Sequence, residues 1–229
     1  MKPMKLFILV GAIGAIGSLV GSAIGLTASN GARAAVPSIS PPAQEVQVKL
    51  TYADSQAFAD RPLYAAGTSV DGVPLLTILH VTRVESNRVL GAASDENRVM
   101  FLYGKCGSSP TPDQSCAADA QIHIWPICER NPAVETRQGV SLSVAPPVAP
   151  TDSTMRGVPA RSMDFGKDGY RIELYTARVT IVVWGASRVL ADDVVANLKP
   201  VNDLAASELG TGMNLPAPSL AALDGRVAC

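Results

Sequence analysis

The chain has 229 residues, of which 47% are hydrophobic and 17% charged, and its 19 lysines and arginines nearly balance 20 aspartates and glutamates. This length is enough to bury a hydrophobic core. A formal net charge of −1 lacks the basic surface that attracts phosphates, so no nucleic-acid partner is predicted. The composition also excludes collagen, a coiled coil and a multi-span membrane protein, and 19 glycines with 17 prolines predict long loops.

Residues 1–34 have the pattern of a secretory signal peptide or an N-terminal membrane anchor. Lys2 and Lys5 precede an uncharged apolar run over residues 6–26. Positive charge ahead of an apolar run is typical of export signals, which keep those charges in the cytoplasm. The segment Ala32-Arg33-Ala34 matches a signal-peptidase site and predicts a mature chain that starts at Ala35.

The length of the apolar run leaves cleavage and anchoring both open. A signal peptide needs about 7–15 apolar residues, whereas a membrane-spanning helix needs about 20, and residues 6–26 are long enough to span. Gly17, Gly21 and Gly25 are four residues apart, a spacing that lets two membrane helices approach closely. In both cases the rest of the protein is predicted to be extracytoplasmic, either secreted or anchored to the cytoplasmic membrane through residues 6–26.

A linker over residues 35–45 and a single α+β domain over residues 46–229 are predicted to follow. Apolar and polar residues alternate over residues 46–52, which is typical of a half-buried strand. A helical turn is expected over residues 54–60. Further strands are predicted over residues 75–84, 98–104 and 120–125.

The later part of the chain contains a predicted hairpin. Two β-rich runs, residues 171–176 and 178–184, meet at a tight turn, and the second run is apolar on both faces, as in a central strand. Residues 131–154 contain four prolines and show weak periodicity, which predicts a loop. An irregular tail is expected over residues 202–222, and a last edge strand over residues 226–228.

A helix is predicted to follow the hairpin, because Ser187 is suited to cap it and apolar residues follow at helical spacing. Leu190, Val194 and Leu198 form one apolar face, and Pro200 ends the helix. An antiparallel sheet with a packed C-terminal helix is an α+β fold. Long Pro-rich loops and disulfide bonds are expected to complete it.

Four cysteines in an exported chain predict two disulfides. They are Cys106, Cys116, Cys128 and Cys229. Three pairings are possible. The favoured one joins Cys106 to Cys116 across a short flexible segment and Cys128 to Cys229.

These cysteines belong to a wider pattern that resembles a group of uncharacterised exported bacterial proteins. The pattern consists of YGKC at 103–106, Cys116, WPICER at 125–130, RGVPA at 156–160, ELYT at 173–176 and the C-terminal Cys229. The resemblance covers most of the exported chain. It supports the disulfide prediction and implies no activity.

No catalytic constellation is visible in the sequence. His80 and His123 are the two histidines, and the spacing of His123 from Cys116 and Cys128 lacks the paired C-x2-C of structural zinc sites, so neither a metal nor another cofactor is predicted. The G-x-S-x-G, P-loop and dinucleotide-binding motifs are absent.

The sequence therefore predicts a non-enzymatic extracytoplasmic domain that binds a protein or an envelope component. Trp125 and His123 are the predicted partner contacts, because an exposed tryptophan beside Pro126 is suited to hold a partner. One alternative is an accessory subunit of an envelope complex, held in the membrane by uncleaved residues 6–26. A second alternative is an extracytoplasmic hydrolase that uses His80 or His123.

Overall fold

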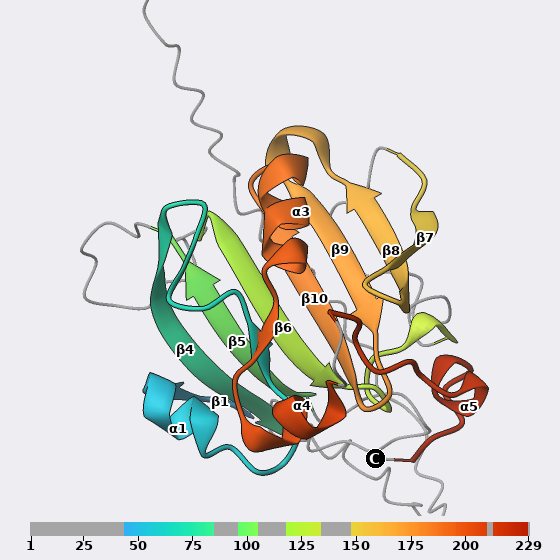
Figure 1. Cartoon of the computed structure of the whole chain (residues 1–229), viewed down its shortest axis with the longest axis horizontal. Helices are drawn as coiled ribbons and strands as arrows, with labels where there is room; N and C mark the ends of the chain where they lie inside the picture. Colours follow the sequence, from blue (N-terminus) through green and yellow to red (C-terminus); the bar gives the residue numbers. More distant parts are fainter. Residues whose placement is uncertain (1–43, 85–95, 105–117, 134–147, 210–212, 229) are drawn as a thin grey trace, which may run out of the picture. The chain divides into compact units, whose positions relative to one another are not determined.

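Figure 1 shows the computed structural model of the chain. The structure describes residues 44–84, 96–104, 118–133, 148–209 and 213–228. They belong to the compact unit Ser40–Cys229, one of two units in the chain. The predicted signal or anchor, residues 1–34, lies outside the described residues. Within the described part, no helix is long and apolar enough to cross a membrane.

A nine-stranded antiparallel sheet dominates this unit, so the fold is mostly β with short helices (Figure 1). The order is β1-β4-β5-β6-β10-β9-β8-β7, and β3 pairs with β4. The strands are β1 (Gln44–Leu50), β3 (Ser69–Val70), β4 (Val73–Val84), β5 (Glu96–Tyr103), β6 (Ala120–Pro126), β7 (Thr151–Met155), β8 (Val158–Asp164), β9 (Tyr170–Tyr175) and β10 (Val179–Gly185). A separate two-stranded sheet joins β2 (Tyr64–Ala65) to β11 (Lys199–Pro200).

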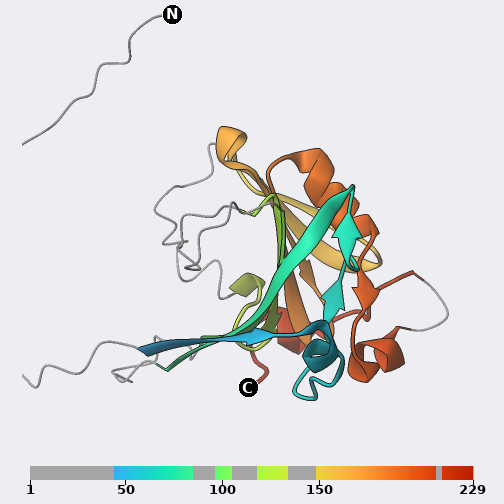
Figure 2. The same cartoon turned by 90° about the vertical axis from the view of Figure 1, so that its left-hand side faces the viewer.

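The helices are short. They are α1 (Tyr52–Gln56), the 3-10 turn η1 (Gly166–Asp168), α3 (Arg188–Ala196), α4 (Asp203–Glu208) and α5 (Leu220–Leu223). Helix α3 packs against β10, β9 and β6. Figure 2, in which the molecule is turned by 90°, shows α3 on one side of the sheet.

The predicted hairpin and its helix are confirmed. Strand β10 lies between β6 and β9 and is buried along nearly its whole length, as expected of a central strand. Ser187 caps α3 by accepting a 3.2 Å hydrogen bond from the backbone N–H of Leu190. Val194 and Leu198 are buried in the core between α3 and the sheet. Gly185 lets α3 approach, because a Cβ there would lie 2.8 Å from the backbone nitrogen of Ala191.

Three expectations about the fold are corrected. The predicted loop over 131–154 contains the start of β7, whose exposed polar residues pair with β8. The predicted tail over 202–222 contains α4 and part of α5. The predicted edge strand over 226–228 is wrong, because Gly225 turns the chain at a φ of 68° and residues 226–228 pair with no strand.

The side chain of Asn202 links the segment before β2 to the start of α4 through hydrogen bonds. Its Oδ1 accepts from the backbone N–H groups of Leu63 (3.0 Å) and Ala205 (3.1 Å). Its Nδ2 donates to the carbonyl oxygens of Phe58 (2.7 Å) and Arg61 (2.8 Å). The side chain is 4% exposed, so these bonds satisfy a buried amide.

Candidate functional site

The face of the sheet opposite α3 carries polar, charged and aromatic side chains and is called the polar face below. Successive side chains of a strand point to opposite faces of the sheet. On each strand, the residues that alternate with those facing α3 therefore point to the polar face. The antiparallel registers place them in rows across β5, β6, β10, β9 and β8. They include Arg98, Gln121, His123, Trp125, Arg161, Met163, Arg171, Glu173, Tyr175, Thr180, Val182 and Trp184.

A buried carboxylate lies at the centre of the polar face. Glu173 has a side-chain exposure of 0%, and its Oε1 lies 2.6 Å from Nη2 of Arg130 and 3.1 Å from Nε of Arg171. The hydroxyl of Tyr175 donates to Oε2 of Glu173 at 2.9 Å. Two guanidinium groups and a phenol thus surround one buried carboxylate, which keeps its charge paired and its oxygens hydrogen-bonded.

Trp125 lies within this cluster and is buried. The guanidinium carbons of Arg98 and Arg130 lie 4.9 and 5.5 Å from its ring centroid, within the range of cation–π contacts. Trp125 is only 9% exposed, so the sequence expectation of an exposed ring is wrong. A role of Trp125 in partner binding stays a prediction, and it would act by holding these two arginines.

The two histidines lie on opposite faces of the sheet. Nε2 of His123, on the polar face, is 2.9 Å from Oε1 of Gln121. Burial lowers the pKa of His123 to about 3, with repulsion by Arg98 and neighbouring guanidinium groups adding to the effect. His80 lies on the face that carries the core, where its ring packs edge-on against Phe58 at 5.2 Å. The structure therefore does not bring His80 and His123 together.

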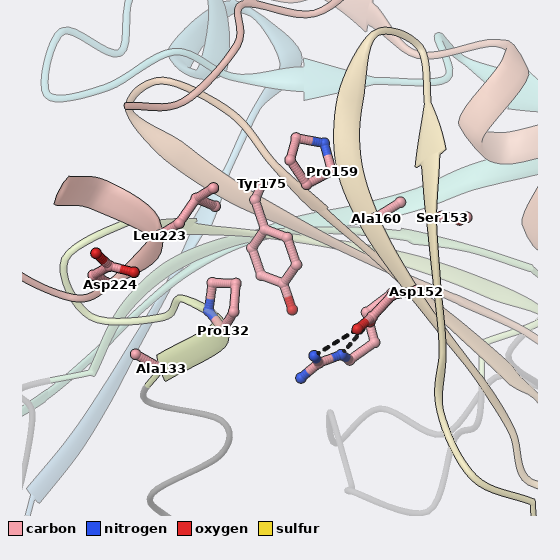
Figure 3. Close-up of a pocket in the computed structure, with 10 residues that line it drawn as sticks. Pro132, Ala133, Asp152, Ser153, Pro159, Ala160, Tyr175, Leu223 and Asp224 are labelled. Carbon is pink, nitrogen blue, oxygen red and sulfur yellow. Dashed lines mark hydrogen bonds and ion pairs between the residues drawn. The ribbon is translucent and has the colours of Figure 1, made fainter. Parts of the chain in front are cut away.

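A groove of about 410 Å³ opens at the β7–β9 end of the polar face (Figure 3). It is lined by Pro132, Ala133, Asp152, Ser153, Pro159, Ala160, Arg161, Tyr175, Leu223 and Asp224. Figure 3 shows the Tyr175 ring between Pro132 and Leu223 on one side and Asp152 on the other. Tyr175 lines the groove, and its hydroxyl is hydrogen-bonded to Glu173. The groove therefore adjoins the buried charge cluster of Glu173, Arg130 and Arg171.

The two sides of the groove differ in chemistry. Arg161 holds Asp152 through two hydrogen bonds, Nε to Oδ1 at 2.7 Å and Nη2 to Oδ2 at 3.1 Å. The hydrogen bonds from Arg161 lower the pKa of Asp152, so this carboxylate is ionised at neutral pH. Pro132 and Leu223 supply apolar surface on the other side. A groove with apolar surface and a few fixed polar groups is suited to binding.

A second hollow, of about 480 Å³, lies at the other end of the polar face. Gln121, Lys167, Asp168 and Trp184 contribute to its lining. Trp184 is half-buried and lies 5.1 Å from the guanidinium carbon of Arg171. The charge cluster around Glu173 thus lies between two hollows on the same face.

Of the four cysteines, the structure describes one. Cys128 follows β6 in a turn and is disulfide-bonded. Cys106, Cys116 and Cys229 lie outside the described residues, and so does the sulfur bonded to Cys128. The Cys106–Cys116 and Cys128–Cys229 pairing therefore stays a prediction.

Sequence reasoning missed the charge cluster and the groove. A signal was present in β9, where Arg171 and Glu173 are two residues apart and opposite in charge within a predicted strand, which the structure shows to be buried. The third member, Arg130, lies 43 residues before Glu173, and no local pattern joins them. Among the described residues, no group of three or more histidines, cysteines, aspartates and glutamates is placed to hold a metal ion.

Comparison of the chain with protein-family models, curated proteins and solved structures found no match.

Proposed function

We propose that this chain is an extracytoplasmic binding domain without catalytic activity, and that it recognises a short segment of a partner protein through the groove. The observation that carries the proposal is the groove beside Tyr175, which combines apolar surface with the ordered Arg161–Asp152 pair. Export is inferred from the positive charges, apolar run and cleavage motif of residues 1–34.

The lining supports binding more than chemistry. Its hydroxyl groups belong to Ser153 and Tyr175, and neither described histidine lines the groove. The Tyr175 hydroxyl already donates to the buried Glu173 carboxylate. Hydrolysis of the serine type requires a nucleophile beside a base. The residues that line the groove do not provide such a pair.

The groove is preorganised by the cluster behind it. Glu173 fixes the phenol of Tyr175, and Arg130 links the same carboxylate to the turn that precedes Pro132. A site whose side chains are already held in place loses less conformational entropy when a ligand binds. This rigidity suits the recognition of an extended peptide segment, whose apolar side chains would pack against Pro132 and Leu223.

Filling the groove tests this proposal. Leu223 of α5 lines the groove, whereas Leu220 of the same helix is 77% exposed and does not line it. Capture of envelope proteins by the wild-type chain should be reduced at least about tenfold by Leu223→Trp, a loss of about 1.4 kcal/mol, and little by Leu220→Trp. Equal capture by all three proteins would contradict the proposal.

The sequence also supports a related function, that of an accessory subunit held at the membrane by residues 6–26. The groove would then serve an envelope complex to which the chain is tethered. N-terminal sequencing of the exported protein separates the two cases. A chain that starts at Ala35 is a released domain, and a chain that keeps Lys2 and Lys5 is an anchored subunit.

A further inference from the structure

The hollow of about 480 Å³ on the polar face, called the second hollow below, lies where three strands meet. Its lining comes from the start of β6, the end of β10 and the 3-10 turn η1 that leads into β9. The groove beside Tyr175 shares none of these described lining residues. A volume of this size is within the range of sites for small ligands, about 300–1,000 Å³.

Bare backbone forms part of the second hollow. Gly169 and Gly185 line it, and a Cβ on Gly169 would lie 2.7 Å from the carbonyl oxygen of Gly185. Gly169 also has a φ of 110°, which glycine adopts without strain. The backbone N–H of Ala186 donates to the carbonyl oxygen of Asp119 at 2.8 Å. These contacts hold the segments around the hollow in fixed positions.

Trp184 gives the second hollow an aromatic surface. Its ring packs against Phe165 at a centroid distance of 5.4 Å and lies 5.1 Å from the guanidinium carbon of Arg171. Arg171 is itself paired with the buried carboxylate of Glu173 at 3.1 Å. The ring is therefore fixed from behind, and because Trp184 is only half-buried, part of it is open to the hollow. A fixed aromatic ring provides a flat apolar surface for the C–H groups of a ligand.

Four polar side chains also line the second hollow: Asp119, Gln121, Lys167 and Asp168. Nζ of Lys167 lies 2.8 Å from Oδ1 of Asp168, so these two charges balance. Oε1 of Gln121 accepts from Nε2 of His123 at 2.9 Å, which leaves the amide nitrogen of Gln121 as a donor. The hollow thus combines carboxylate acceptors with amide and ammonium donors.

This lining distinguishes between classes of ligand. An anion would lie beside two carboxylates that repel it, and a wholly apolar ligand would leave four polar groups without partners. A sugar satisfies both parts of the lining. Its hydroxyl groups donate and accept hydrogen bonds, and the C–H groups on the face of its ring are apolar.

We propose that the second hollow binds a neutral oligosaccharide, with one sugar ring packed on Trp184 and its hydroxyl groups hydrogen-bonded to Asp119, Gln121 and the Lys167–Asp168 pair. Because the second hollow and the groove share no described lining residue, a sugar and a protein segment can be bound at the same time. The chain would then connect a glycan of the envelope to its protein partner.

Calorimetric titration of the full chain tests this site, with maltotriose, mannotriose and the trisaccharide of N-acetylglucosamine as probes. The detergent must lack a sugar headgroup, which would compete. Asp119→Ala removes an exposed acceptor and should weaken binding about tenfold, or about 1.4 kcal/mol. The matched control is Asp192→Ala on α3, whose carboxylate is 46% exposed on the other side of the sheet and should have no effect.

Tryptophan fluorescence gives a second measurement. The chain contains two tryptophans, so Trp125→Phe leaves Trp184 as the only one, and its emission should change as the bound trisaccharide saturates the site. Failure of all three trisaccharides to bind the wild type would overturn the proposal. So would binding that Asp119→Ala leaves unchanged, or binding that leaves the emission of Trp184 unchanged, because either result would assign the sugar to another surface.

Discussion

Glu173 and Arg130 form a 2.6 Å ion pair in which the carboxylate is fully buried and the guanidinium is 18% exposed. The pair connects β9 to the turn after β6, across 43 residues of sequence. It thereby holds together two elements that line the groove, Tyr175 from β9 and Pro132 from the turn. The stability of this pair and the shape of the groove are expected to depend on each other.

The first prediction concerns this buried pair. Glu173→Gln keeps the shape of the side chain but leaves Arg130 and Arg171 beside a neutral amide. Removing one partner of a buried ion pair costs about 3–5 kcal/mol, and urea unfolding should show a loss of this size. The control is Asp152→Asn, which breaks an ion pair with a 70% exposed carboxylate and should cost less than about 1 kcal/mol. Similar losses in both variants would argue against a special role for Glu173.

The second prediction concerns pH. The folded-state pKa of His123 is lowered from 6.5 to about 3, whereas the unfolded chain restores the ordinary value. Between those values the unfolded chain binds a proton that the folded protein does not. The contribution of His123 to the free energy of unfolding is therefore fully present above about pH 6.5. As the pH is lowered below this value, the free energy of unfolding falls by at most about 1.4 kcal/mol per pH unit. His123→Gln should flatten this dependence.

The check is urea unfolding of wild type and His123→Gln at pH 7 and pH 4.5. Other groups, such as Asp152, contribute equally to both proteins, so the difference between their pH slopes isolates His123. Parallel slopes would show that the imidazole ionises as readily in the folded protein as in the unfolded chain.

The third prediction concerns Asn202, whose amide makes four hydrogen bonds to backbone groups. Asn202→Ala removes the N-cap of α4 and leaves buried donors and acceptors unpaired, which should cost about 3 kcal/mol. Asn197→Ala is the matched control, because Asn197 is exposed and its amide donates one bond, to the Asp193 carbonyl oxygen at 2.8 Å. Thermal unfolding should separate the two variants clearly. Equal melting temperatures would contradict the role given to Asn202.

The fourth prediction concerns the disulfides. Cys128 is disulfide-bonded, and the sequence favours Cys229 as its partner. Closing a loop of roughly 100 residues stabilises a fold by up to about 4.7 kcal/mol in the chain-entropy account, so Cys229→Ser should lower stability markedly. Peptide mapping without reduction should find Cys128 joined to Cys229 and Cys106 joined to Cys116. A Cys106–Cys128 peptide would refute the pairing.

The sequence predicts most of the sheet, because most strands carry a local signal. Strand β10 is apolar on both faces, and the helix that follows it combines a capping serine with helical spacing of Val194 and Leu198. Strand β7 has no such signal. Its residues are polar and mostly exposed, so they show no apolar periodicity, and the strand is held by backbone pairing with β8 across the tight turn at Arg156 and Gly157.

The candidate site was less predictable than the fold. The position of Trp125 beside Pro126 and Cys128 predicts a candidate contact, but the surroundings of its ring include Arg98 and Arg130, which approach it from separate segments. The groove depends in the same way on Tyr175 meeting residues near 132 and 223. Contacts between distant segments follow from the order of the strands in the sheet. No single segment of the sequence predicts that order.

The central claim, that the groove receives a partner segment, is tested most directly by crosslinking in the cell that exports the protein. A photoreactive amino acid at Asp152 samples the groove, and one at Thr151 samples the opposite face of the same exposed strand. A defined crosslinked partner is expected from position 152 and much less from position 151, with the product lost when the groove is filled by Leu223→Trp. Equal crosslinking from both positions, or a product from 152 that survives Leu223→Trp, would contradict the claim.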